Sequence, residues 1–154
     1  MNTRSLQVND EIFMRRCLAL ASIAKSRGKT AVGALVVRDN EIIAEGIESS
    51  EEYPALVAHA EIVALLKAAE VLGTRDLSGC IMYTTAEPCF MCSYLLRETK
   101  IGEVVFGASA GQIGGTNPDF PLLTTDKIAR WPVQLTIRGA VLEQECIAML
   151  RKQH

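Results

Sequence analysis

The sequence lacks a long apolar segment, because a charged residue interrupts every hydrophobic run before the roughly 18 residues that a membrane span needs. This excludes a transmembrane role. It also lacks an excess of basic residues, since 16 Lys and Arg stand against 18 Asp and Glu and the net charge is −2. Nucleic-acid-binding domains usually show the opposite balance, so the composition argues against an RNA substrate without excluding one.

The sequence has five cysteines, which are too few, too scattered and odd in number for a disulfide scaffold. No charged and then apolar signal segment opens the chain at residues 1–5, so we expect a protein of the reducing cytoplasm. A domain usually takes about 100–200 residues, and the chain has 154. One compact domain over residues 1–154 is therefore expected.

The expected elements predict a mixed sheet between helices. A first helix should be capped by Asn9 or Asp10 and end at Gly28, and later helices are expected over 57–72, 88–98, 126–130 and 142–152. Strands are expected over 31–37, 41–45, 80–85, 103–107 and 133–137, the first two joined by a turn at 39–40. Two antiparallel strands followed by alternating helices and strands predict a three-layer α/β fold.

The chain has only two histidines, and one of them is its last residue. The other, His59, lies two residues before Glu61 at the start of an expected helix. Thirty residues after His59, Cys89 and Cys92 form a Cys-x-x-Cys pair at the start of the next expected helix. Such a pair and one distant imidazole offer three ligands to zinc, whereas a structural zinc site would use four.

Three protein ligands leave one position on zinc for water, whose pKa the metal lowers toward neutrality. Helix N-termini favour the thiolate forms of Cys89 and Cys92. Glu61 is then the expected general base and acid beside that water. Because residues two apart on a helix point to different sides, we expect His59 in the first turn, with its side chain projecting past the helix end.

Other interpretations of the cysteines stay open at this point. Cys89 and Cys92 could form a thioredoxin-like redox pair, although the His-x-Glu pattern disfavours this. A zinc ribbon would need a second Cys-x-x-Cys. The remaining cysteines are isolated and are most simply buried small apolar residues: Cys17, Cys80 and Cys146.

Together, His-x-Glu and the later Pro-Cys-x-x-Cys match the signature of zinc-dependent nucleobase deaminases. The chain resembles the cytidine deaminase-like superfamily and, within it, the branch of bacterial tRNA adenosine deaminases and guanine deaminases. The resemblance covers most of the chain and is carried by residues 32–34, 58–62, 84–92 and 104–108. It implies a five-stranded sheet flanked by helices and assembly into at least a homodimer.

The resemblance also implies the site. His59, Cys89 and Cys92 would hold one zinc ion per subunit with a bound water or hydroxide, and Glu61 would be the proton shuttle. Backbone groups near three further residues would line the pocket: Val32, Ala58 and Glu87. The implied reaction is hydrolytic loss of ammonia from a ring carbon that carries an exocyclic amine.

Glu48 departs from the family pattern. Relatives usually carry Asn shortly after the second strand to read the base, and the spacing to His59 places Glu48 there. An ionised Glu only accepts hydrogen bonds, so it would prefer a substrate edge rich in N–H donors. An exposed loop glutamate beside the acidic Glu51 and Glu52 is an equal alternative.

The glycine-rich segment 108–121 is expected to be a functional loop. In it, Asp119 would accept a hydrogen bond from a ring N–H or an amine, and Phe120 would stack on a flat base. The alternative is a turn at 117–119 with Phe120 in the core, which we favour slightly for Phe120. Trp131 is expected to serve in packing.

The C-terminal residues 151–154 lack the longer basic extension of many tRNA adenosine deaminases, so fewer RNA contacts are expected. A basic patch could still form on the first helix, although a solvated helix face is the simpler interpretation. Its members would be Arg15, Arg16, Lys25, Arg27 and Lys29.

Three functions follow in order. The first is a zinc-dependent aminohydrolase that acts on a small base or nucleoside, with a purine-like ring such as guanine. The second is a tRNA adenosine deaminase, which shares the catalytic residues but needs a basic surface around the pocket. The third is a catalytically silent, zinc-stabilised interaction protein, against which Glu61 argues because a structural metal site has no use for it.

Overall fold

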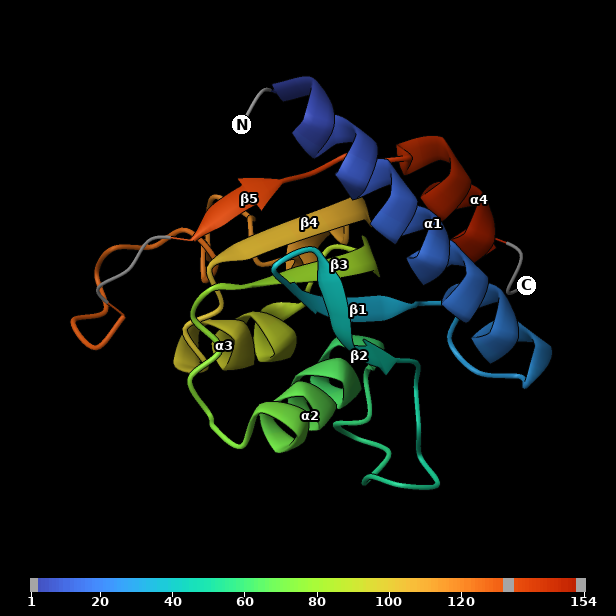
Figure 1. The fold of residues 1–154 in the computed structure, drawn as a ribbon, viewed down its shortest axis with the longest axis horizontal. Coiled ribbons are helices and arrows are strands. Elements are labelled where there is room, and N and C mark those ends of the chain that lie inside the picture. The colour runs from blue at the N-terminus through green and yellow to red at the C-terminus, as the bar shows by residue number, and fades with distance from the viewer. Residues whose placement is uncertain (1–2, 132–134, 152–154) are drawn as a thin grey trace.

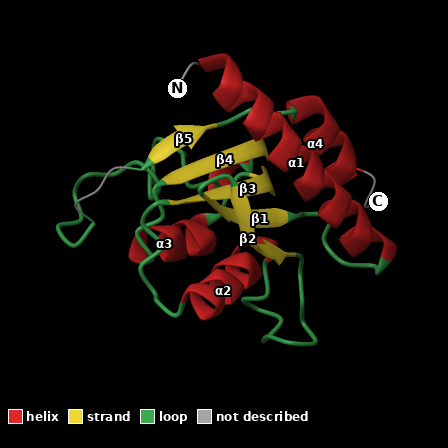
Figure 2. Cartoon of the chain, in the orientation of Figure 1, coloured by secondary structure: helices red, strands yellow, loops and turns green. Residues whose placement is uncertain are grey.

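The computed structural model describes residues 3–131 and 135–151, which form three layers (Figures 1 and 2). The elements in chain order are α1 (Thr3–Ser26), β1 (Ala34–Arg38), β2 (Glu41–Gly46), α2 (Ala60–Leu72), β3 (Cys80–Ala86), α3 (Phe90–Glu98), β4 (Glu103–Ala108), the short 3₁₀ helix η1 (Gly111–Ile113), β5 (Thr136–Arg138) and α4 (Glu143–Arg151). Within the described residues, five strands form one sheet in the order β2-β1-β3-β4-β5. The predicted three-layer fold with a mixed sheet is confirmed.

The sheet combines an antiparallel part with a parallel part. β1 and β2 form the predicted hairpin, whose turn residues Asp39 and Asn40 have φ angles of 51° and 65°. Asp and Asn tolerate this left-handed conformation better than most residues. β1 also pairs antiparallel with β3, whereas β3, β4 and β5 run parallel. Helix α3 provides the crossover that a parallel β3–β4 pair requires.

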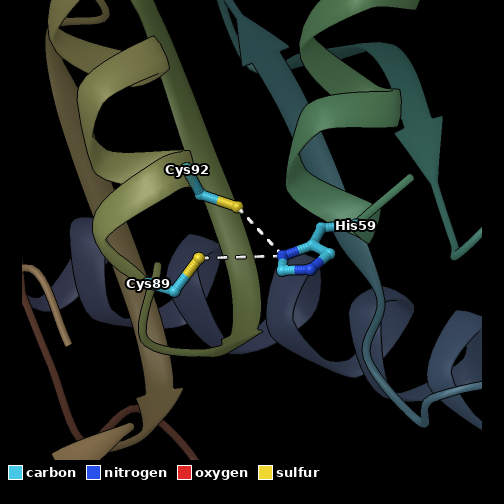
Figure 3. Close-up of side chains that lie close together, drawn as sticks. All are labelled: His59, Cys89 and Cys92. Atoms are coloured by element: carbon cyan, nitrogen blue, oxygen red, sulfur yellow. Dashed lines mark hydrogen bonds between the residues drawn. The ribbon is translucent and has the colours of Figure 1, made fainter. Parts of the chain in front are cut away.

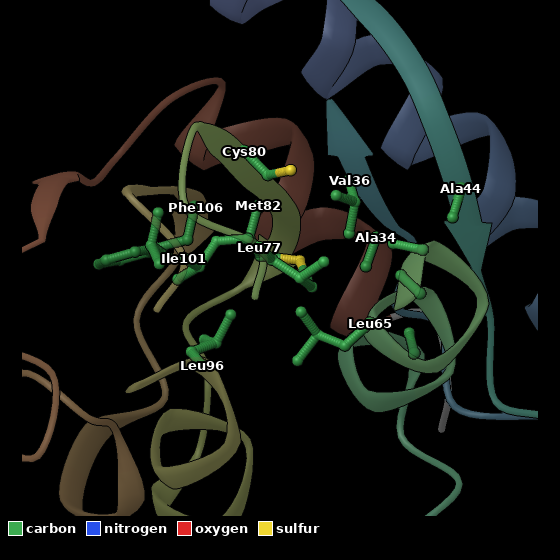
Figure 4. Close-up of a cluster of buried hydrophobic side chains, with 14 of the residues drawn as sticks. Ala34, Val36, Ala44, Leu65, Leu77, Cys80, Met82, Leu96, Ile101 and Phe106 are labelled. Carbon is green, nitrogen blue, oxygen red and sulfur yellow. The ribbon is translucent and has the colours of Figure 1, made fainter. Parts of the chain in front are cut away.

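Two apolar clusters hold the layers together. One lies between the sheet and α2 and α3, and Figure 4 shows it around Leu65, Met82 and Leu96. The other lies on the opposite face against α1 and α4, and it contains Met14 and Tyr83. Met82 and Tyr83 are adjacent in β3 and enter different clusters, because side chains alternate along a strand. The three isolated cysteines are free and buried in these clusters, as predicted: Cys17, Cys80 and Cys146.

Helix α1 begins at Thr3, so the prediction that Asn9 or Asp10 caps it is wrong. Asp10 lies within the helix and is only 5% exposed. Its carboxylate accepts hydrogen bonds from the Tyr83 hydroxyl at 2.7 Å and from the Arg138 guanidinium at 2.7 and 3.0 Å. Asp10 is therefore a buried anchor between α1, β3 and β5.

The predicted helix over 126–130 is wrong, because the chain is irregular there. The buried guanidinium of Arg97, in α3, donates hydrogen bonds to three carbonyl oxygens of this region, those of Leu122, Thr125 and Trp131. A side chain thus binds carbonyl groups that a helix would pair with its own N–H groups. Trp131 is buried with the Arg97 guanidinium over its ring, which confirms its predicted role in packing.

Several element boundaries also differ from prediction. The expected starts of β1, α2 and α3 lie two or three residues too early. β5 begins at Thr136, and positions 133 and 134 of the predicted strand lie outside the described residues. The later starts leave Val32, His59 and Cys89 just before regular elements. None of the helices described is both long and apolar enough to cross a membrane.

Candidate active site

The site lies at one edge of the sheet. β3 and β4 are parallel, so their carboxyl ends share this edge, where Ala86 pairs with Ala108. β1 runs the other way, and its first residue Ala34 pairs there with Thr84 and with Gly46 at the end of β2. Ligands of open α/β sheets bind outside the carboxyl ends of strands. The topology therefore brings together the segments that follow β2, β3 and β4 and the one that precedes β1.

His59 and Cys89 are the N-cap residues of α2 and α3. Both have extended backbone, with φ and ψ of −64° and 149° at His59 and of −70° and 178° at Cys89. Neither side chain caps its helix with a hydrogen bond, and in Figure 3 the imidazole points from α2 toward the two thiols at the start of α3. Because His59 lies outside the regular helix, it shares a site with Glu61 although only one residue separates them.

The donor atoms of His59, Cys89 and Cys92 converge (Figure 3). Nδ1 of His59 lies 3.5 Å from Sγ of Cys92 and 3.7 Å from Sγ of Cys89, and all three atoms lie within 4.8 Å of one another. A tetrahedral zinc ion with Zn–S distances of about 2.3 Å and a Zn–N distance of about 2.1 Å separates a sulfur and a nitrogen ligand by roughly 3.6 Å. The three donors therefore fit zinc, and imidazole and thiolate are ligands that zinc accepts well.

The electrostatics of the site suit metal binding and proton transfer. A hydrogen bond from Cys92 lowers the pKa of Cys89 to about 5, and the same bond raises the pKa of Cys92. One thiolate therefore forms readily. Glu61, in the first turn of α2, is 5% exposed, and burial raises its pKa to about 7. A carboxyl group with a pKa near neutrality can both take up and release a proton.

His59, Glu61 and Cys89 line a cavity of about 260 Å³. Its other walls come from the segment before β1, the loop between β2 and α2, the end of β3 and the loop after β4. Pockets for drug-sized ligands usually measure about 300–1,000 Å³. A cavity slightly below that range suits one small planar ring.

The structure brings three of the predicted substrate contacts to this cavity: Val32, Glu48 and Glu87. Glu48 is half-buried, and its Oε2 accepts a hydrogen bond from the Thr30 N–H at 2.8 Å, which holds the carboxylate at the wall. This is unlike the exposed loop glutamate of the alternative interpretation. Ala58 is fully buried and is not among the lining residues, although its neighbour His59 is.

Asp119 and Phe120 lie outside the lining of the cavity. The Asp119 N–H donates a hydrogen bond to Oδ1 of Asn117 at 2.9 Å, which confirms the predicted turn. Phe120 is 63% exposed and meets Phe90 edge to face with ring centroids 6.0 Å apart. The prediction that Phe120 fills the core is therefore wrong. A substrate contact by either residue stays a prediction.

Four residues that the sequence did not reveal also line the cavity: Thr30, Ala55, Ala110 and Ile113. Two of them belong to the glycine-rich loop that the sequence had marked as functional, but the acidic and aromatic residues further along the loop carried the stronger chemical signal. Small and aliphatic residues have no such signal. Only the path of the loop along the cavity identifies them.

The basic residues of α1 and the turn after it are partly neutralised by nearby carboxylates. The Arg16 guanidinium donates to both carboxylate oxygens of Glu45, at 2.6 and 2.9 Å, and Lys29 forms an ion pair with Glu51. Paired charges of this kind support the solvated helix face more than a surface for phosphates.

Known proteins share both the sequence and the fold. Residues 7–108 match the family model of the cytidine and deoxycytidylate deaminase zinc-binding region. The chain is 40% identical over 144 residues to the tRNA-specific adenosine deaminase of Aquifex aeolicus, covering 92% of this chain and 95% of that protein.

Two solved structures extend this comparison. One, from studies of A-to-I editing by tRNA:A34 deaminases at the wobble position, has a TM-score of 0.81 and 28% identity over 90% of this chain and 98% of the other. The guanine deaminase of Nitrosomonas europaea has a TM-score of 0.75 and 25% identity over 93% of this chain and 83% of the other. The same fold therefore occurs with two kinds of purine deaminase.

The family match covers more than half of the chain and includes all the residues that meet at the cavity's inner end. Those residues present three zinc ligands and one buried carboxyl group. The chain is a zinc-dependent hydrolytic deaminase and belongs to the cytidine and deoxycytidylate deaminase family.

Proposed function

We propose that this deaminase converts adenosine to inosine in transfer RNA. The observation that carries the proposal is the similarity to the tRNA-specific adenosine deaminase of Aquifex aeolicus, which extends over nearly the full length of both chains. The sequence by itself ranked a small free base first because of its net charge and short C-terminus. Net charge averages over the whole surface and does not describe the rim of one cavity, so the full-length similarity outweighs it.

When held by His59, Cys89 and Cys92, zinc supplies an activated water molecule beside the substrate ring. Glu61 takes a proton from this water and delivers it to N1 of adenine, and it later protonates the amino group that leaves. Water is consumed, and inosine and ammonia are the products. The burial of Glu61 keeps the proton next to the reacting atoms and away from bulk solvent.

The cavity volume supports a substrate that presents a single base. A nucleotide in a stacked RNA segment has to swing out before a deaminase can reach its amine. A cavity of about 260 Å³ holds one such ring and leaves the neighbouring nucleotides outside. Val32 and Ile113 provide aliphatic surface against which a planar ring can pack.

Guanine is the second candidate, and the position of Glu48 favours it. An ionised carboxylate only accepts hydrogen bonds. Adenine offers ring nitrogens that are acceptors apart from the amine that reacts, whereas guanine carries ring N–H donors. The carboxylate of Glu48 at the cavity wall therefore matches guanine better than adenine.

We expect the chain to work as a homodimer of single deaminase domains, each spanning residues 1–154 and holding one zinc ion. Exposed apolar side chains on α2, Leu66 and Val71, support an interface with a second copy. Light scattering on the purified protein tests this, because a dimer has twice the mass of one chain. A cytoplasmic location also stays a prediction.

The experiment compares zinc-loaded protein on an RNA anticodon stem-loop with adenosine at the wobble position and on free guanine, adenine, adenosine and cytosine. We expect inosine to form in the stem-loop and Glu61→Gln to abolish it. Turnover of guanine alone would overturn the tRNA proposal and support the second candidate. Glu48→Gln should then lower guanine turnover, whereas Glu45→Gln, a matched change outside the cavity, should not.

A further inference from the structure

Part of the glycine-rich loop after β4 is bordered by open space on two sides. Ala110 and Ile113 line the cavity of the active site. Gly111 and Thr116, in the same loop, line a second hollow of about 320 Å³. Apolar packing is therefore limited here, and the position of this loop depends on its hydrogen bonds.

One buried carboxylate, that of Glu87, holds the loop. Its Oε1 accepts hydrogen bonds from the Ala110 N–H at 3.0 Å and the Ser109 hydroxyl at 3.3 Å. Its Oε2 accepts from the N–H and the hydroxyl of Thr116 at 2.8 and 2.6 Å. A carboxylate has about four acceptor sites, so the loop uses its full capacity. Burial alone would raise the pKa of Glu87, but these hydrogen bonds lower it, and the group stays ionised.

The backbone of the loop is shaped to pass close to this carboxylate. A Cβ atom at Gly114 would lie 2.4 Å from the carboxylate atoms of Glu87, so only glycine fits. Gly114 also forms a β-bridge with Cys89, and the Gly115 N–H donates to the Pro88 carbonyl at 2.9 Å. The loop is thus docked on the same turn that carries a zinc ligand.

We propose that Ile113 contacts the ring of the substrate and that Glu87 is the positioning residue that keeps Ile113 at the cavity. Ile113 lines the cavity and is still 58% exposed, so a bound ring would cover apolar surface that water now reaches. An aliphatic side chain makes no hydrogen bond, so it packs against a ring whatever its substituents. The inference rests on the proposed function in assuming a planar base in this cavity.

The test of Ile113 is the binding of purine to the zinc-loaded protein by titration calorimetry. Purine has no exocyclic amine, so it probes binding without turnover. Ile113→Ala should raise the Kd about tenfold, and should raise KM for a turned-over substrate by a similar factor while kcat changes less. The matched control is Ile12→Ala, because Ile12 in α1 is also 58% exposed and lies outside the cavity.

The test of Glu87 adds hydrogen exchange of the backbone. Glu87→Gln should raise the Kd for purine about tenfold and speed amide exchange at residues 110 and 116, with zinc content unchanged. Thr116→Val removes only the hydroxyl contact and serves if Glu87→Gln does not fold. It should raise the Kd about threefold, and Thr116→Ser should restore it.

A purely structural role would give a different result. It would lower the melting temperature of the Glu87 and Thr116 variants without changing their affinity for purine. Tyr83→Phe, which removes one hydrogen bond on the far face of the sheet, is the control for lost stability alone. Equal affinities of wild type and Ile113→Ala, or no purine binding by wild type, would overturn the inference. A failure to deaminate RNA leaves this titration decisive, so the two failures are distinguishable.

Discussion

The two faces of the sheet each carry a cluster of buried polar side chains, and the clusters differ in how their charges are matched. On the α1 face, the Asp10 carboxylate receives hydrogen bonds from Tyr83 and Arg138. At the N-termini of α2 and α3, two thiols and an imidazole converge beside the buried carboxyl group of Glu61. The first cluster is complementary, whereas the second brings together groups that compete to be neutral.

The pKa shifts express the same difference. On the α1 face the hydrogen bond with Asp10 raises the pKa of Arg138, and burial with the bond to Asp10 raises the pKa of Tyr83, so both stay in the forms that bind Asp10. At the active site, burial brings the pKa of Glu61 to about 7 and a hydrogen bond brings that of Cys89 to about 5, values at which protons exchange near neutral pH. A complementary cluster stabilises the fold, and a mismatched one provides reactivity.

The largest expected effect comes from Glu61→Gln. The amide keeps the shape of the side chain but cannot shuttle a proton, so kcat/KM should fall by about 10²–10⁴-fold. Zinc content and melting temperature should stay near those of wild type. Metal analysis, thermal melting and inosine or ammonia release check this. Activity within tenfold of wild type would contradict the assignment of Glu61.

Cys92→Ala should come next, since it removes one of three zinc ligands. After dialysis against a chelator we expect zinc to fall well below one ion per chain and activity to fall in proportion. Cys80→Ala is the matched control, because Cys80 is also free and buried but lies away from the cavity. Retention of one zinc ion per chain by Cys92→Ala would show that Cys92 is not a ligand.

On the opposite face, Asp10→Asn should lower stability and leave chemistry alone. It removes the charge that Arg138 faces at 2.7 Å, and breaking a buried ion pair costs about 3 kcal/mol in the free energy of unfolding. Denaturant titration measures this, and kcat/KM of the folded variant should equal that of wild type. Lost activity with unchanged stability would contradict the contrast between the faces.

The smallest effect is expected at the exposed Arg16–Glu45 pair of the α1 face. The hydrogen bond from Arg16 lowers the pKa of Glu45, so the pair stabilises the fold above the unfolded pKa and loses this effect as the pH falls through the folded pKa. Glu45→Gln should cost less than about 1 kcal/mol at neutral pH because the pair is solvated. The difference from wild type should shrink below about pH 4. A difference that is constant down to pH 3 would rule out the ion pair as its cause.

The metal-ligand residues were predictable from the sequence because they are rare and regularly spaced. His59 is one of two histidines, and Cys89 and Cys92 have the spacing of a two-ligand turn. The roles of Asp10 and Glu87 were not predictable, because their partners lie up to 128 and 29 residues away. Nothing in the local sequence distinguishes a buried anchor from a helix cap or a pocket residue.

The sequence by itself determined the order of the elements, the mixed sheet and the zinc-binding residues with their proton shuttle, because hydrophobic periodicity and short-range spacing act within a few residues of the chain. The tertiary structure alone decided which wall faces the substrate. Ile113 reaches the cavity, and Asp119 and Phe120 do not, because Glu87 binds the loop at Ala110 and Thr116. That selection depends on contacts between distant segments, which form only when the sheet has brought them together.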